Sequence, residues 1–310
     1  LRRDHATGGR RHGRGAVLTP PRAPLYRGGM SDIVLVLGGG GARGLAHIGA
    51  IRALHDRGVR ARALAGCSMG GIVGAFLAAG YDAQEMEEVA RGIGYRAFLS
   101  FGEAGGIVGG ERIEALFAEH LPETFEELDR PLLLTAVDVQ KGELVVLKEG
   151  PLVPALRATS ALPGLIAPVR SGDRVLVDGG LLNNLPVDLA RTLGHAPVVA
   201  IDVAAPPDRR LSFEERGVLD RMREVVQPQR ALTVELFMKS FDVPQALVSQ
   251  MRLAMAPPDL LVRPPLDRDF GVEEFGRIDE ALEAGERSMH EALDGVSFTG
   301  QASGEAGVSP

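Results

Sequence analysis

The 310-residue sequence has one cysteine, no tryptophan and only 5% aromatic residues. The single Cys67 cannot form an internal disulfide or supply a four-ligand zinc site, so nothing indicates an oxidising compartment or a structural metal. A hydrophobic content of 45% and a charged content of 24% exclude collagen-like, disulfide-scaffold and wholly disordered chains. We therefore expect a globular protein of a reducing compartment, the cytoplasm.

Outside the first residues, acidic side chains outnumber basic ones. Residues 1–29 contain seven arginines and a single acid, a net charge of +6, which leaves −13 for the rest of a chain whose total is −7. A strongly acidic body is a poor nucleic-acid binder, because affinity for phosphate needs a basic surface. The basic leader is rich in glycine and proline, so we interpret residues 1–29 as disordered, with the folded part beginning at Met30 and ending before a disordered tail at 297–310.

A hydrophobic run of the kind that a membrane helix requires is also missing. Residues 63–81 are nineteen consecutive uncharged residues, but they include five glycines. The turn at 66–71 divides them into a strand and a helix that is too short to cross a bilayer. We expect no transmembrane helix and no signal peptide, and peripheral contact with a membrane stays an open alternative.

Apolar runs alternate with helical patterns along the chain. Residues 33–37 are apolar at every position, as in a strand buried on both faces, and they lead through a glycine loop into residues with helical spacing up to Gly58. Further strands are expected at 62–65, 132–137, 144–147, 174–177, 198–203 and 260–262, and helices over much of 82–130, 211–256 and 272–294. The pattern predicts an α/β fold with a central, mostly parallel sheet in one domain.

The glycine loop contains Gly39-x-Gly41-x-x-Gly44, which also suits a dinucleotide-binding fold. That fold needs an acidic residue at the end of the next strand, and residues 60–66 contain none. No Gly-Lys-Ser or Gly-Lys-Thr follows either, so a P-loop is excluded. What remains is a turn rich in backbone N–H groups at a helix N-terminus, which is suited to bind negative charge.

The second strand, turn and helix contain the pattern Gly66-x-Ser68-x-Gly70. This is the nucleophile-elbow pattern, in which small neighbours permit a strained turn that presents the serine hydroxyl at the end of a sheet. A serine that attacks an ester carbonyl creates an oxyanion, which the N–H groups of the glycine loop can stabilise. Since two neighbouring parallel strands end at the same edge, we expect the loop and Ser68 to lie together.

A serine nucleophile needs a base. Three of the histidines are poorly placed for this role: His195 lies in a connection expected at the opposite edge of the sheet, His290 within a late helix and His120 at the end of an acidic one. His47 is near the loop, where packing or hydrogen bonding is the favoured interpretation. Asp178 follows the strand expected at 174–177, where we expect it at the same edge of the sheet as the loop and Ser68, and it precedes two glycines. It is therefore either a general base or an ordinary Asp-Gly turn.

Three stretches, in order along the chain, resemble the signatures of the small bacterial patatin-like phospholipases: Gly39–Gly44, Gly66–Gly70 and Asp178–Gly180. The resemblance covers about residues 33–205 and includes 157–164 and 183–186. It implies a patatin-type three-layer α/β/α domain over 30–296, with the core motifs in 33–205 and a helical C-terminal part in 206–296.

The resemblance also implies the roles of particular residues. Ser68 is the expected nucleophile and Asp178 the expected base, a dyad that needs no metal or cofactor. The expected oxyanion hole consists of N–H groups of Gly39, Gly40 and Gly41, and the expected supporting residues are Arg43, Gly44, Gly66, Gly70, Gly179 and Gly180. For Arg43, shaping the loop and adding positive potential are both open.

The predicted activity is serine-dependent hydrolysis of lipid acyl esters, of the phospholipase A or lysophospholipase type. Two alternatives from other classes are a catalytically weak regulatory or interaction protein on the same fold and a nucleotide-binding module that uses the glycine loop. The apolar residues of 236–256 are interpreted as ordinary core, with an acyl pocket or a membrane-facing surface as the alternatives.

Overall fold

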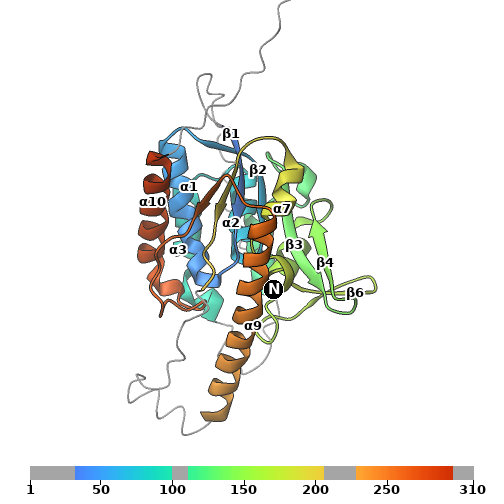
Figure 1. Cartoon of the computed structure of the whole chain (residues 1–310). Helices are drawn as coiled ribbons and strands as arrows, with labels where there is room; N and C mark the ends of the chain where they lie inside the picture. Colours follow the sequence, from blue (N-terminus) through green and yellow to red (C-terminus); the bar gives the residue numbers. More distant parts are fainter. Residues whose placement is uncertain (1–31, 100–110, 206–227, 296–310) are drawn as a thin grey trace, which may run out of the picture.

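The computed structural model describes residues 32–99, 111–205 and 228–295, which form a sheet covered by helices on both faces (Figure 1). The strands are β1 (Asp32–Leu37), β2 (Arg60–Gly66), β3 (Leu132–Asp138), β4 (Glu143–Leu147), β5 (Val169–Ser171), β6 (Arg174–Asp178), β7 (Val198–Ile201) and β8 (Leu260–Val262). The α-helices are α1 (Ala46–Asp56), α2 (Ser68–Ala78), α3 (Ala83–Leu99), α4 (Glu111–His120), α5 (Leu152–Thr159), α6 (Gly180–Asn183), α7 (Val187–Ala190), α9 (Pro228–Met255) and α10 (Ile278–Asp294). Short 3-10 helices are η1 (Gly41–Leu45), η2 (Phe125–Glu127), η3 (Arg191–Leu193) and η4 (Phe275–Arg277).

The sheet has a parallel centre and an antiparallel side. Its strand order is β5-β6-β3-β2-β1-β7-β8, and β4 pairs with β3 off this path. The strands β3, β2, β1, β7 and β8 run parallel, whereas β4 and β6 are antiparallel to β3 and β5 is antiparallel to β6. The predicted α/β class with a mostly parallel sheet is confirmed. The strand β5 was not predicted, because three residues carry too little pattern to be recognised as a strand.

Alternate residues of β1 face two separate cores. Ile33, Leu35 and Leu37 belong to the larger core, which α1, α2 and α10 cover. Val34 and Val36 belong to a smaller core, which is completed by residues of α7 and α9. Successive side chains of a strand point to opposite faces, so an apolar run without interruption is what a sheet between two helical layers requires.

Helices α1 and α10 are in backbone contact through two glycines. A Cβ atom on Gly285 would overlap the carbonyl oxygen of Ala46, and one on Gly49 would overlap that of Leu282. Glycine at both positions therefore lets the two helix axes approach more closely than any other residue would. Figure 1 shows α10 lying along the outer side of α1.

The uncharged run at 63–81 folds as the turn-and-helix interpretation predicts. Its first residues end β2, and α2 starts at Ser68. Among the helices of the described ranges, none combines the length and the apolarity that crossing a bilayer requires.

Several expectations fall outside the described residues. These are the basic leader 1–29, residues 100–110 of the mostly helical region predicted over 82–130, the segment 211–227 of a predicted helix and the tail 297–310. The predicted domain limits also stay predictions.

Candidate active site

The glycine loop and Ser68 lie at the carboxyl ends of two neighbouring parallel strands. Leu37, the last residue of β1, pairs with Gly66, the last residue of β2, so the chain leaves both strands at the same level. The two segments are in close contact, because a Cβ atom on Gly39 would lie 3.1 Å from Cβ of Ser68. The predicted meeting of loop and serine is therefore observed.

Asp178 reaches the same place by a different route from the one expected. It does end a strand, but β6 runs antiparallel to β3, so its carboxyl end does not belong to the common edge of the parallel strands. The register pairs Asp178 with Ala136, two residues beyond Leu134, which pairs with Gly66. A strand that runs in the opposite direction thus stops at the level where β2 turns into α2.

Ser68 is held in a strained backbone conformation. Its φ is +51°, and among the described residues it is the only residue other than glycine with a positive φ. The preceding residue, Cys67, is extended, with φ −132° and ψ 138°. The turn needs small neighbours, because a Cβ atom on Gly70 would overlap the carbonyl oxygen of Leu37. Backbone strain of this kind persists only where surrounding structure enforces it, and it is concentrated at functional sites.

Asp178 is buried, with 3% of its surface exposed. The Gly180 N–H donates to Oδ1 at 2.8 Å, and the Cys67 thiol lies 3.5 Å from the same oxygen. Burial raises the pKa of Asp178 to about 6, although the Gly180 N–H and the Ser68 and Cys67 side chains lower it. The result is a carboxylate that is ionised at neutral pH and much more basic than an exposed aspartate.

The Cys67 thiol acts as a donor to this carboxylate and stays protonated. Burial raises the pKa of Cys67 well above its ordinary value, and the nearby charge of Asp178 raises it further. A thiol in these surroundings is unreactive as a nucleophile, since the thiolate is the reactive form.

A chain of threonines fixes the backbone of the serine turn. The Ser68 N–H donates to Oγ1 of Thr159 at 3.0 Å, and that hydroxyl donates to the carbonyl oxygen of Thr135 at 2.7 Å. The Thr135 hydroxyl in turn donates to the carbonyl oxygen of Asn183 at 3.1 Å. Both threonines are fully buried, so the turn is tied to the centre of β3 and to the helix α6 that follows Asp178.

Asn184 holds the glycine loop through one of its amides, and two other amides of the loop have no acceptor among the described residues. The Gly39 N–H donates to the carbonyl oxygen of Asn184 at 3.2 Å, and the Asn184 side chain donates to the Gly39 carbonyl at 3.0 Å. The Gly39 amide, one of the three expected oxyanion donors, is therefore already engaged. Within the described part of the chain, the amides of Gly40 and Gly41 have no hydrogen-bond acceptor.

Arg43 shapes the loop through buried hydrogen bonds. Its guanidinium donates to the carbonyl oxygens of Val203 at 2.9 Å and of Asp267 and Phe270 at 3.1 Å each, and 3% of its surface is exposed. Of the two roles left open by the sequence, the geometry supports loop shaping. Because these acceptors lie 160 to 227 residues away in the chain, no local pattern could have revealed them.

His47 packs beneath the loop, as the favoured interpretation predicted. Its Nε2 lies 2.8 Å from the carbonyl oxygen of Gly38, and the ring is fully buried. Burial lowers the pKa of His47 to about 4, so the ring is neutral at pH 7 and Nε2 carries the proton that bonds to this carbonyl. His47 therefore supports the end of β1 and does not contact the Ser68 hydroxyl.

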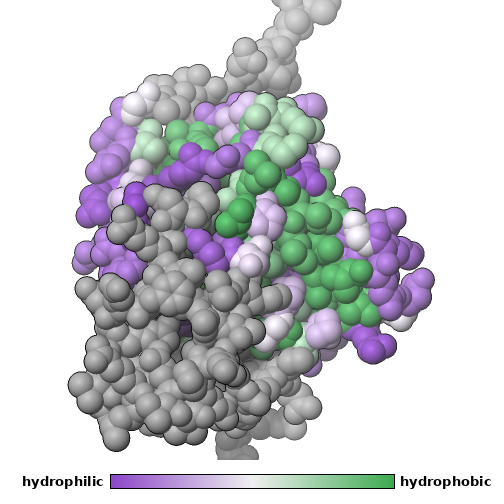
Figure 2. Space-filling view, turned by 60° about the horizontal axis from the view of Figure 1, so that its bottom comes forward, coloured by the Kyte–Doolittle hydropathy of each residue, from purple (hydrophilic) through white to green (hydrophobic). Residues whose placement is uncertain are grey.

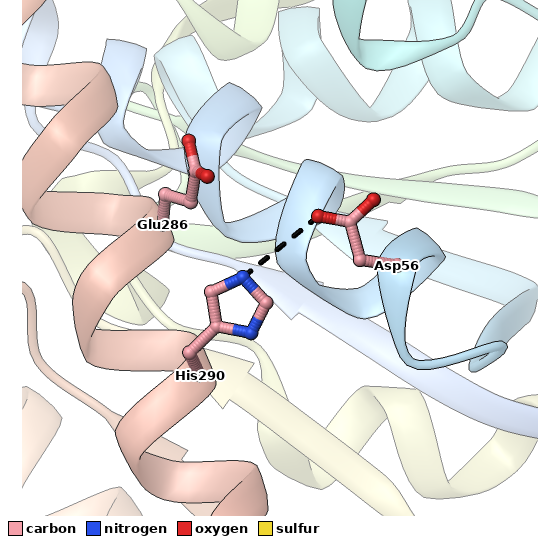
Figure 3. A group of neighbouring side chains, drawn as sticks. All are labelled: Asp56, Glu286 and His290. Carbon is pink, nitrogen blue, oxygen red and sulfur yellow. Dashed lines mark ion pairs between the residues drawn. The ribbon is translucent and has the colours of Figure 1, made fainter.

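One group of side chains in the described residues has the composition of a metal site, and it lies away from Ser68. Figure 3 shows Asp56 at the end of α1 facing His290 of α10, with Glu286 one turn earlier on α10. Nε2 of His290 is 3.8 Å from the Asp56 carboxylate, whereas Glu286 bonds to Arg52 at 3.1 Å. We interpret this group as surface ion pairs, because Glu286 is already paired with a cation.

The apolar residues of α9 are only partly the core residues that we expected. Phe241 is buried, but Val243, Leu247, Met251 and Met255 are between 52% and 82% exposed. The side chains of 228–238 lie outside the described set. Figure 2 views the molecule from below Figure 1, the side where the parallel strands end, and shows hydrophobic side chains gathered in one area with hydrophilic ones beside it.

These observations define an α/β protein in which a strained serine turn, a buried carboxylate and a glycine loop meet at one end of a mixed sheet. A family model for patatin-like phospholipase matches residues 35–191, and the chain belongs to this family. Membership supports lipid hydrolase activity in general and confirms the resemblance seen in the sequence.

The curated relatives are longer than this chain. An uncharacterized NTE family protein of Mycobacterium tuberculosis is 31% identical over 281 residues, which are 84% of this chain and 46% of the relative. The mouse patatin-like phospholipase domain-containing protein 6 is 32% identical over 192 residues, 59% of this chain and 14% of the relative. The chain thus spans about half the length of the mycobacterial relatives that it matches.

Two solved structures resemble this chain at low sequence identity. VipD from Legionella pneumophila aligns over 86% of this chain and 67% of its own, with 15% identity and a TM-score of 0.47. The ExoU–SpcU complex of Pseudomonas aeruginosa aligns over 86% of this chain and 51% of the matched chain, with 16% identity and a TM-score of 0.44.

Proposed function

We propose that this chain hydrolyses carboxylic esters of lipids, such as phospholipids or lysophospholipids, through an acyl-enzyme on Ser68. The observation that carries the proposal is the placement of Ser68, in its strained turn, beside a buried Asp178 whose pKa is raised to about 6 by burial and lowered by the Ser68 side chain. A base with a pKa slightly below the working pH is mostly ionised and still basic enough to take a proton from an attacking hydroxyl. Family membership supports the lipid class of substrate.

The reaction has two balanced steps. In the first, Oγ of Ser68 attacks the ester carbonyl carbon while its proton passes to Asp178, and the alcohol leaves with that proton as the C–O bond breaks. In the second, Asp178 takes a proton from water, the hydroxide attacks the acyl carbon, and Ser68 regains its proton as the carboxylic acid leaves. Within the chain, Ser68 and Asp178 are the groups that exchange protons, with the leaving alcohol in the first step and with water in the second.

Three backbone amides of the glycine loop and of the first turn of α2 are the proposed donors to the developing oxyanion. The N–H groups of Gly40 and Gly41 are available in the glycine loop, and that of Met69 lies in the first turn of α2, where helix N–H groups have no intrahelical acceptor. We assign the hole to these three amides, with the Gly39 amide holding the loop to Asn184. Each preorganised donor is worth roughly 3 kcal/mol of transition-state stabilisation.

The proposal is tested with a fluorophosphonate probe and a series of p-nitrophenyl esters. We expect wild type to be labelled and active, Ser68→Ala to lose both labelling and turnover, and Asp178→Asn to lose most of its turnover. Asp138→Asn is the matched control, because Asp138 is also buried but its Oδ1 accepts backbone N–H groups of Gln140 and Val175. A folded wild type without labelling or turnover would refute the proposal and favour the regulatory protein.

A further inference from the structure

A cavity of about 300 Å³ lies beside the first two turns of the helix that carries Ser68. Helix α2 contributes Met69, Ile72, Val73 and Phe76 to its wall, and this spacing places all four side chains on one face of the helix. Ser68 is the first residue of α2, so the cavity starts at the residue after the nucleophile. It follows the helix over about 10 Å, at 1.5 Å per residue.

The opposite wall is apolar too. Met86 and Val89 of α3 face α2 across the cavity, with Ile48 of α1 at one side. Arg91 is the charged residue in the lining, and its guanidinium is paired with Glu87 at 2.8 Å and with Asp279. Apolar walls offer water few hydrogen bonds, so such a cavity takes up apolar groups readily.

We propose that this α2–α3 cavity binds the acyl chain of the ester, an inference that rests on the proposed function of Ser68. An acyl group bonded to Oγ of Ser68 has its carbonyl at the glycine loop, and its chain extends past Met69 into the cavity. The volume is at the lower end of the range for ligand sites, which suits an acyl chain of medium length better than a long one. The unbranched Met69 side chain adapts its shape at the entrance.

The exposed face of α9 is the competing place for an acyl chain. Its apolar residues Val243, Leu247, Met251 and Met255 recur every four residues and are all exposed. They form a stripe on a helix surface, whereas the α2–α3 cavity is hollow and has Met69, the residue after the nucleophile, in its wall. Leu247 therefore supplies the matched control for substitutions in the cavity.

The first test is the dependence of kcat/KM on acyl length in p-nitrophenyl esters from acetate to palmitate. Each methylene that enters the cavity raises kcat/KM about fourfold in wild type until the cavity is full. Ile72→Phe and Val89→Phe fill the cavity from opposite walls at two half-buried positions. If the larger ring displaces three methylenes, kcat/KM for the decanoate ester falls about 60-fold while that for acetate is unchanged. Leu247→Phe keeps the wild-type profile.

The second test measures binding without turnover. Dodecanoic acid should raise the Tm of wild type, Ser68→Ala and Leu247→Phe, and it should not raise that of Ile72→Phe or Val89→Phe. An Ile72→Phe variant that hydrolyses acetate and keeps the wild-type length profile overturns the inference and leaves the proposed function standing. Loss of turnover for every ester in wild type, with the pattern of dodecanoate shifts intact, refutes the proposed function and retains the cavity as a site for alkyl chains. If wild type shows neither ester turnover nor a Tm shift with dodecanoic acid, the proposed function and the acyl-chain site are both refuted.

Discussion

Replacing Asp178 by asparagine should make the protein more stable at neutral pH while it removes the proposed base. The carboxylate is 3% exposed, and burial raises its pKa from 3.8 to about 6. Asparagine keeps an oxygen that can accept the Gly180 N–H, which donates to Oδ1 of Asp178 at 2.8 Å. The substitution therefore removes a buried charge and retains the shape of the turn.

The magnitude follows from proton linkage. The folded state holds this proton more tightly than the unfolded state, so unfolding free energy is lost as the pH rises from 3.8 to about 6 and is lost in full above that range. A difference of about two pKa units corresponds to about 3 kcal/mol at pH 7 and about 1 kcal/mol at pH 4.5. Asparagine does not ionise, so the unfolding free energy of Asp178→Asn relative to wild type should increase by about 2 kcal/mol from pH 4.5 to pH 7.

Urea unfolding of both proteins at pH 4.5 and 7 measures this difference. Asp138→Asn serves as the control for removing a buried carboxylate that does not contact Ser68. If Asp178→Asn were no more stable relative to wild type at pH 7 than at pH 4.5, the raised pKa, and with it the account of Asp178 as a buried base, would be refuted.

Three further outcomes are expected. The kcat/KM of wild type for short esters should rise with pH through an apparent pKa of about 6, because the base works when ionised, and a profile that is flat between pH 5 and 7 would contradict this. Gly70→Ala should cost about 3 kcal/mol or more of unfolding free energy, because its Cβ atom overlaps the Leu37 carbonyl oxygen. Gly74→Ala in the same helix should raise the free energy of unfolding by up to about 1 kcal/mol, because a Cβ atom there has no neighbour closer than 3.4 Å. Equal effects of the two substitutions on urea unfolding would be inconsistent with the turn described. Arg43→Lys should lower the free energy of unfolding by about 3 kcal/mol, because an ammonium cannot replace hydrogen bonds to three separate carbonyls. In the same urea unfolding experiment, Arg57→Lys at a partly exposed side chain should change this free energy little.

The predictable part of the fold is the part in which side chains report their surroundings locally. The run 33–37 is apolar at each position because both faces of β1 are covered, so five adjacent residues are enough to indicate a buried strand. The serine turn was predictable for a similar reason, since its small neighbours stand within two residues of Ser68. The direction of β6 was not predictable, because a strand of five residues has the same pattern in either direction.

The hydrogen-bonded support of the site illustrates what local pattern cannot show. Thr159 and Asn184 lie in stretches that resembled the family, but their bonds to Ser68 and Gly39 join residues 91 and 145 positions apart. The exposed apolar residues of α9 were misjudged because composition does not reveal which side of a helix has a neighbour. Both failures concern contacts between distant segments, which depend on how the whole chain packs.

The bonds from Arg43 to Asp267 and Phe270 bear on where this protein can be cut or recombined. The family match ends at residue 191, yet the glycine loop is anchored more than seventy residues later, and the Ala42 N–H donates to the Val272 carbonyl oxygen at 2.7 Å. A fragment that stops at the end of the matched segment would keep Ser68 and Asp178 but lose the scaffold of the loop. Chimeras within the family should therefore take the segment around 267–272 and the loop at 39–43 from the same parent protein.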